Sequence, residues 1–131
     1  MTTRSARKTG TGRGDLFDPV CPTRQLLDRI GTKWTSMAVK VLAAAAPDEV
    51  RFAELRRQMP GVSQKMLSVT LQSLVRDGLV ARRVEATVPP RVHYRLTGLG
   101  LSLETPLAAL RAWAEEHMAE IDHANAQADS L

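Results

Sequence analysis

The sequence has one cysteine, few aromatic residues and no long apolar run. A single cysteine among 131 residues excludes an intrachain disulfide, so a reducing cytoplasm is the expected location. No apolar run approaches the roughly 18 residues of a membrane span, and no apolar segment follows the first basic residues, so we expect neither membrane association nor a secretory signal. Apolar residues make up 44% of the chain, which is ordinary for a globular protein and predicts one domain with one core.

Motifs of enzymes and metal sites are also missing. The sequence contains no HExxH, no glycine-rich phosphate loop and no GxSxG. Its three histidines (His93, His117 and His123) are scattered, and together with one thiol they make poor zinc ligands. We therefore expect no enzyme, no catalytic residue, no cofactor and no metal. A metal-responsive regulator that uses His117 with Glu116 and Glu120 is the weaker alternative.

Charge is sorted along the chain, although the net charge is only +4. Residues 1–14 carry four cations and no acid, and residues 51–95 carry nine cations and three acids. From residue 104 onward, six acids accompany one arginine. This distribution predicts one face for a polyanion and another for a different partner. Residues 1–14 are expected to be a disordered basic arm, and a solubilising tail is favoured over an arm that enters a DNA minor groove.

The stretch 52–78 predicts two helices joined by a tight turn. The first helix covers about 53–59, and Gly61 supplies the backbone freedom of the turn. Ser63 is a suitable N-cap for the second helix, and Gly78 is expected to end it in the left-handed conformation. The buried stripe of the second helix has helical spacing. It consists of Leu67, Leu71, Leu74 and Val75.

A second face of this helix carries groups that suit phosphate oxygens and base edges. These groups are Lys65, Ser68, Gln72 and Arg76. A merely solvated polar face is the alternative. Two strands follow, at about 79–85 and 92–96, and the period of two places Val92, Tyr94 and Leu96 toward the core. The loop between the strands is stiffened by two prolines and flanked by four arginines. These arginines are Arg82, Arg83, Arg91 and Arg95.

Helices are also predicted at both ends of the folded part, which should span about 15–122. One begins at Pro22 and ends at Gly31, and the next begins near Thr32 and ends at Pro47. A brief strand at 50–52 could pair with the hairpin. The last helix covers about 99–121, with a kink or a fresh start at Pro106, and a frayed tail is expected at 123–131.

The last helix carries a seam of the kind that two helices share. The seam consists of Leu103, Leu107, Leu110, Ala114, His117 and Ile121. Trp113 flanks the seam as a candidate anchor. A second copy of the chain is the favoured partner, and a helix folded back on its own domain is the alternative. The predicted fold is mainly α with a small β-wing (α+β), a winged helix-turn-helix that is dimeric through its terminal helices.

Short motifs along residues 20–120 occur in the order and spacing of one protein family. They are Cys21-Pro22, Ile30-Gly31, Lys33-Trp34-Thr35, Arg51-Phe52-Ala53-Glu54-Leu55-Arg56, Gly61-Val62-Ser63-Gln64-Lys65-Met66-Leu67, Leu74, Asp77-Gly78-Leu79-Val80, Val88-Pro89-Pro90-Arg91-Val92 and Tyr94-Arg95-Leu96-Thr97. Together they resemble the HxlR-type (MarR-like) winged helix-turn-helix transcriptional regulators of bacteria. The chain departs from the family pattern at Gly98, where proline is common, and at Asp48-Glu49, where the loop is usually more basic.

The resemblance implies a homodimer that binds double-stranded DNA at an inverted-repeat operator, with repression favoured over activation. The residues expected at the DNA are Ser63, Gln64, Lys65, Ser68, Gln72, Arg82, Arg91 and Arg95. Several family members respond to oxidants or electrophiles through a cysteine placed like Cys21, so an oxidant, a quinone or an aldehyde is a candidate effector. The start of a helix and the nearby Arg24 favour the reactive thiolate at Cys21, whereas a small buried residue at the dimer interface is the alternative.

Two other interpretations of the winged helix stay open. One is control by a small-molecule ligand at the dimer interface, and the other is a protein-interaction module without DNA binding.

Overall fold

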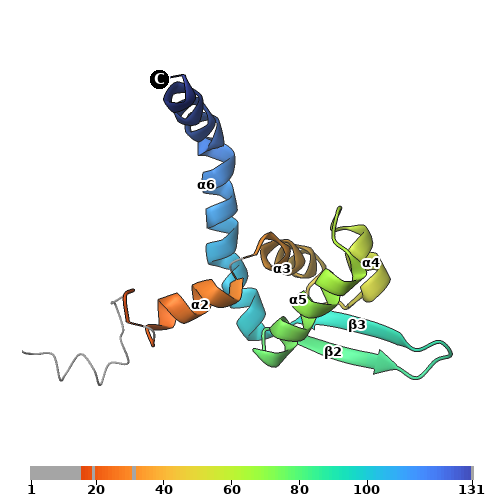
Figure 1. Ribbon diagram of the computed structural model, residues 1–131. Helices are drawn as coiled ribbons and strands as arrows, with labels where there is room; N and C mark the ends of the chain where they lie inside the picture. Colours follow the sequence, from red (N-terminus) through yellow and green to blue (C-terminus); the bar gives the residue numbers. More distant parts are fainter. Residues whose placement is uncertain (1–15, 19, 31, 131) are drawn as a thin grey trace, which may run out of the picture.

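In the computed structural model, residues 16–18, 20–30 and 32–130 are described (Figure 1). The predicted basic arm at 1–14 and Gly31, the expected end of the first helix, lie outside the described residues. The elements are α2 (Pro22–Ile30), α3 (Lys33–Ala45), β1 (Val50–Arg51), α4 (Phe52–Arg57), α5 (Gln64–Arg76), β2 (Val80–Glu85), β3 (Arg91–Leu96) and α6 (Gly98–Asp129). This order is the predicted winged helix-turn-helix. Among the described residues, no helix combines the length and the apolar character that a bilayer span requires.

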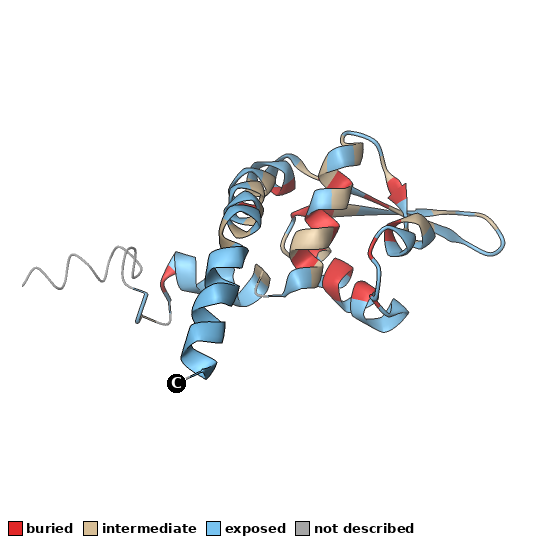
Figure 2. Ribbon diagram, turned by 90° about the horizontal axis from the view of Figure 1, so that it is seen from above, coloured by how far each residue is buried: buried red, intermediate tan, exposed pale blue. Residues whose placement is uncertain are grey.

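The core lies where α3, α5 and the sheet meet. From α3, Ala38, Val39 and Leu42 are fully buried. Figure 2 shows the buried positions gathered in this part of the molecule, whereas α6 is exposed over most of its length. Burial on α5 follows the predicted stripe with one change, because Thr70 is buried and Val75 is only half-buried.

Both ends of α5 are capped as the sequence predicts. At the start, the Ser63 hydroxyl accepts a hydrogen bond from the backbone N–H of Met66 at 3.0 Å. At the end, Gly78 has φ +76°. There the N–H groups of Gly78 and Leu79 donate to the carbonyls of Val75 and Leu74, each at 3.0 Å. These two bonds satisfy carbonyls that a helix end leaves free, so the direction in which the chain leaves α5 is fixed locally.

The sheet has three antiparallel strands in the order β1-β3-β2. The brief strand expected at 50–52 is confirmed, since Val50 of β1 pairs with Tyr94 of β3. On the other side of β3, Val80 pairs with Leu96 and Val84 pairs with Val92. We call the hairpin of β2 and β3, with the loop between them, the wing. Tyr94 and Leu96 are buried as predicted, so one face of the wing packs on the core.

The last helix differs from its prediction at its far end. It begins at Gly98, where the Thr97 hydroxyl accepts from the Gly100 N–H at 3.1 Å, so the absence of a proline is offset by a side-chain cap. Pro106 lies inside one continuous helix and does not start a new one. The helix continues to Asp129 instead of ending near Ile121, because the polar segment that follows is rich in alanine, the best helix former. In Figure 1 its C-terminal half projects away from the rest of the domain.

Gly100 occupies the tightest contact between α6 and the sheet. A Cβ at this position would lie 2.0 Å from the Leu79 carbonyl oxygen and 2.8 Å from Leu96 Cδ2. A Cβ on Gly98, in the same turn of the helix, would have no atom within 4 Å. The first turn of α6 therefore packs directly on the backbone at the start of the wing.

We expect Gly100→Ala to lower the free energy of unfolding by about 1–3 kcal/mol, because backbone has to move to admit the methyl group. The control Gly98→Ala should be neutral or stabilising by about 0.4–1 kcal/mol, since alanine restricts the unfolded chain. Urea unfolding followed by circular dichroism, at one protein concentration, measures both variants. Equal effects of the two substitutions would contradict the close approach.

Candidate nucleic-acid interface

A concave surface lies between α5 and the inner face of the wing. It has a volume of about 430 Å³ and includes Gln64 and Ser68 of α5 together with Arg82 and Arg91 of the wing. A second hollow of about 340 Å³ continues it along α5 to Gln72. We call this continuous surface the groove. Among the described residues, no acidic side chain lines either part.

The residues of the groove divide into a floor and a rim. Tyr94 and Val92 form the apolar floor, and the two amides and one hydroxyl of α5 stand along one side. Arg82 and Arg91, both exposed, stand on the other side. Arg82 pairs directly with Tyr94, and residues directly opposite in an antiparallel pair share a face of the sheet. The groove therefore offers hydrogen-bond donors and acceptors next to positive charge. Of the two arginines, Arg91 lies opposite Glu85 and helps to lower the pKa of that carboxyl group.

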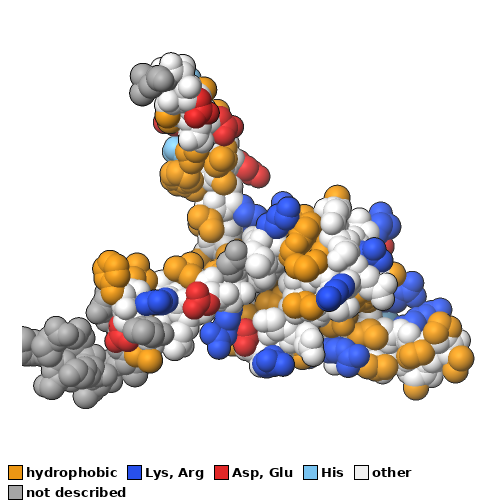
Figure 3. All heavy atoms as spheres, in the orientation of Figure 1, with side chains coloured by type: hydrophobic (Ala, Val, Ile, Leu, Met, Phe, Trp, Pro, Cys, Tyr) orange, Lys and Arg blue, Asp and Glu red, His pale blue; other side chains and the backbone are white. Residues whose placement is uncertain are grey.

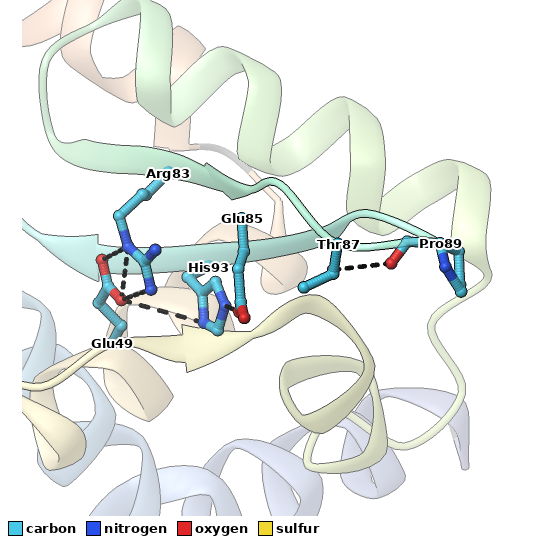
Figure 4. Close-up of polar contacts among 6 residues, drawn as sticks. All are labelled: Glu49, Arg83, Glu85, Thr87, Pro89 and His93. Carbon is cyan, nitrogen blue, oxygen red and sulfur yellow. Dashed lines mark hydrogen bonds and ion pairs between the residues drawn. The ribbon is translucent and has the colours of Figure 1, made fainter.

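The opposite face of the sheet carries cations that are already paired (Figure 4). Arg83 donates from Nε and Nη2 to the Glu49 carboxylate, with its shortest contact at 2.8 Å. The Arg83 guanidinium holds the pKa of Glu49 below its ordinary value. His93 Nε2 lies 2.8 Å from Glu85 Oε1, and this hydrogen bond is the main cause of the lowered pKa of Glu85. Of the Asp48-Glu49 pair, Glu49 thus supplies the partner of Arg83.

Arg95 lies on this paired face. Strand residues alternate between faces, so Arg95 shares the side of His93 while Tyr94 faces the core. Its charge also lowers the pKa of Glu49. Arg95 is therefore separated from the groove, although it was predicted to bind DNA together with Arg82 and Arg91. Arg91 alternates onto the same side of β3 as Arg95, but it lies at the wing end of the strand and also lines the groove.

The structure places the remaining predicted DNA-binding residues around the groove in different ways. Gln64, Ser68 and Gln72 line it, Ser63 caps the helix, and Lys65 points to solvent on the outer side of α5. Arg51, which was not predicted as a site residue, also lines the groove. Its signal in the sequence was its place in the short strand beside the wing.

The wing tip is braced by hydrogen bonds within the loop. The Thr87 hydroxyl donates to the Pro89 carbonyl at 2.8 Å (Figure 4). The Thr87 N–H donates to the Glu85 carbonyl at 2.8 Å. Val88 is fully exposed.

Figure 3 shows Lys and Arg side chains distributed over the winged part of the face in view, whereas acidic side chains gather on the projecting part of α6.

The predicted seam on α6 divides into two parts. Leu107 is buried, and Leu103 is half-buried, against the core of the same chain. Beyond them, Leu110 is 64% exposed and Trp113 is 51% exposed. Trp113 stacks on His117 with ring centroids 4.4 Å apart. Ala114 and His117 are half-buried and Ile121 is exposed, so the upper part of the seam has apolar surface without a partner within the described chain.

Cys21 lies at the foot of α2 with its side chain fully buried. Its N–H donates to the Asp18 carbonyl at 2.9 Å, and its own carbonyl accepts from the Gln25 N–H at 3.0 Å. None of the residues of α2 itself is buried, and its leucines Leu26 and Leu27 are exposed. At the other end of the helix, Arg29 lies 3.4 Å from Asp77, the C-cap residue of α5.

Comparison with known proteins identifies the relatives of the chain. The model of the HxlR-like helix-turn-helix family matches residues 29–122. The uncharacterized HTH-type transcriptional regulator YtfH of Escherichia coli (strain K12) is 40% identical over 108 residues, covering 82% of this chain and 83% of the relative. The structure of a putative transcriptional regulator YtfH from Salmonella typhimurium matches with a TM-score of 0.75 and 36% identity, over 86% of this chain and 98% of the other. The redox regulator HypR in its reduced form matches with a TM-score of 0.68 and 34% identity, over 78% and 98%.

Proposed function

Because the chain belongs to the HxlR-like helix-turn-helix family of transcriptional regulators, we propose that it binds an inverted-repeat operator as a homodimer, with repression as the favoured outcome. The family consists of transcriptional regulators and not of enzymes. DNA is therefore its partner, and the operator geometry, the dimer and the effector are the parts that we propose here.

The groove beside α5 is the observation that supports specific DNA binding. Glutamine amides pair with adenine in the major groove, and lysine donates to guanine O6 and N7. We assign base reading to Gln64, Gln72 and Lys65, which lie on the outer sides of α5. Arg82 and Arg91 are exposed at the rim, where they can contact phosphates once α5 enters the major groove. Arg83 is less available for this role, because a phosphate has to compete with its bidentate contact to Glu49.

Selection of DNA from a random pool tests the operator. We expect an inverted repeat whose half-sites are separated by about one helical turn or a multiple of it. Lys65→Ala should change the base preference, because each good side-chain contact to a base provides about 1–3 kcal/mol of discrimination. An unchanged preference in Lys65→Ala and Gln64→Ala would exclude α5 as the reading helix.

The neighbouring arginines Arg82 and Arg83 provide a matched pair for the phosphate contacts. Arg82→Ala should weaken binding to all sequences alike and reduce the salt dependence by about one counterion per protomer. Arg83→Ala removes the same charge from the opposite face of the strand, where Glu49 already neutralises it, and should leave the slope unchanged. A gel shift or anisotropy titration between 50 and 200 mM salt, about the range over which such contacts are sensitive, compares them. Equal slopes for the two variants would refute the assignment of the groove.

The proposed dimer is supported by α2 and by the upper part of α6. An amphipathic helix that buries none of its residues leaves its apolar side to water, which is unfavourable for a lone chain. A mainly apolar hollow of about 470 Å³ also lies between the two helices, and it is lined by Leu26 of α2 and by Leu99, Leu103 and Pro106 of α6. A partner protomer would cover these surfaces together. In the ligand-controlled alternative, an apolar effector would bind in this hollow between α2 and α6.

Leu110→Glu tests the dimer. This position belongs to the seam but is outside the core of its own chain, so a charge there should separate protomers without unfolding them. Ala119→Glu adds the same charge on the opposite side of α6 and should preserve the dimer. Light scattering should give twice the 14.4 kDa chain mass for the wild type and for Ala119→Glu. A monomeric wild type would overturn the proposal.

Oxidant or electrophile sensing by Cys21 is a second candidate function. HypR, a structural relative, is a redox regulator. Cys21 immediately precedes α2, and α2 touches the C-cap of α5 through Arg29 and Asp77. The thiol is fully buried, so an oxidant reaches it only when the foot of α2 opens. Cys21 is the single cysteine of the chain, so an oxidised pair has to join two protomers.

Diamide treatment of the wild type and of Cys21→Ser tests this candidate. Each of two Cys21 thiols gives up one proton and one electron to diamide, which becomes the hydrazine, and a disulfide forms between protomers. We expect a non-reducing gel to show a cross-linked dimer and operator affinity to change in the wild type alone. Quinone adducts and mixed disulfides would appear as a mass increase instead. Equal responses of wild type and serine variant, or none, would remove Cys21 as the sensor.

A further inference from the structure

Two apolar side chains on α5 belong to no part of the core. Val69 is 52% exposed and Met66 is 41% exposed. Neither side chain is in the core cluster or packed against it. The buried residues of this helix, Leu67, Leu71 and Leu74 among them, occupy its other side. Burial within the chain therefore does not account for Val69 and Met66.

Val69 and Met66 lie on the side of α5 that faces away from the core. Each residue of an α-helix advances about 100° around the axis. Val69 thus lies between Lys65, one turn earlier, and Gln72, one turn later, in the middle of the side that faces away from the core. Met66 adjoins Val69 on the flank opposite the groove. The outer side of α5 is polar next to the wing and apolar on its other flank.

A single exposed valine on an ordinary surface needs no explanation. Here the surrounding residues on α5 include cations and amides, with Lys65 and Arg76 both exposed, and such a surface suits the polyanion that the proposed function places against it. The major groove of DNA presents one apolar group, the 5-methyl group of thymine. Valine has one strongly preferred rotamer in a helix, so its methyl groups are held in place before DNA arrives.

We infer that Val69 reads the 5-methyl group of a thymine in each half-site, with Met66 bordering the same contact. This inference rests on the proposed entry of α5 into the major groove. It adds a hydrophobic specificity contact to the hydrogen bonds assigned to Lys65 and the glutamines. It also predicts the location of the thymine, which should adjoin the base pair read by Lys65.

Replacement of thymine by deoxyuridine tests the contact, because it removes the methyl group and preserves every hydrogen-bonding group. In the operator selected by the wild type, each thymine is replaced singly and in symmetric pairs, and the affinity is measured by anisotropy. One position should weaken wild-type binding by about 3- to 10-fold per half-site, as expected for loss of one buried methyl contact. In Val69→Ala this ratio between thymine and uracil should fall below about twofold.

Val88→Ala is the control, since it removes the same methyl groups from a fully exposed valine at the wing tip. It should retain the wild-type ratio, and circular dichroism should show that both variants fold. Three results would overturn the inference while specific binding stands: a selected operator without a thymine common to both half-sites, no sensitive thymine, or an unchanged ratio in Val69→Ala. If the wild type selects no sequence at all, the proposed function fails first and the inference fails with it.

Discussion

A small set of hydrogen bonds around Gly78 and Thr97 joins the three functional parts of the molecule. The Thr97 hydroxyl donates to the Gly78 carbonyl at 2.7 Å, and the Thr97 N–H donates to the Leu79 carbonyl at 3.1 Å. Gly78 ends α5, Leu79 leads into the wing, and Thr97 caps α6. Helix α5, the wing and the projecting helix α6 therefore leave one junction in fixed directions. The missing Cβ of Gly100 permits this close contact.

Pairing of charge decides which arginines remain available to a polyanion. Acidic partners occupy the outer face of the sheet, where Glu49 holds Arg83 and Glu85 holds His93. In the part of the chain that the structure describes, no acid lines the groove on the inner face. Exposed ion pairs contribute only about 0–1 kcal/mol to stability, so the effect of this arrangement on folding is small. Its effect on binding is larger, because a phosphate has to compete with Glu49 for Arg83 but not for Arg82.

Local signals made most of the reading helix predictable. Ser63, Gly61 and Gly78 act on their immediate neighbours, and the spacing of the leucines fixes the buried side of α5. The faces of the wing were predictable in part, since the alternation of Tyr94 and Arg95 already placed Arg95 away from the core. The sequence could not show which residues of the seam on α6 pack within the chain and which remain exposed. Helical spacing is the same for Leu107, which packs within the chain, and for Leu110, which does not, because periodicity gives a direction and not the identity of the neighbour.

The link between α2 and α5 limits how a signal at Cys21 could change DNA binding. The only described contact of α2 with the end of α5 that involves charge is between Arg29 and Asp77, at 3.4 Å and partly exposed. A tenfold change in affinity needs about 1.4 kcal/mol, which exceeds what an exposed pair usually provides. A switch through this pair alone would therefore be weak. The stronger route is geometric, because in the proposed dimer the two copies of α5 have to match two half-sites at a set spacing. A shift of α2 that changes how protomers pack would misplace one helix relative to the other, and both contacts with the operator would be lost together.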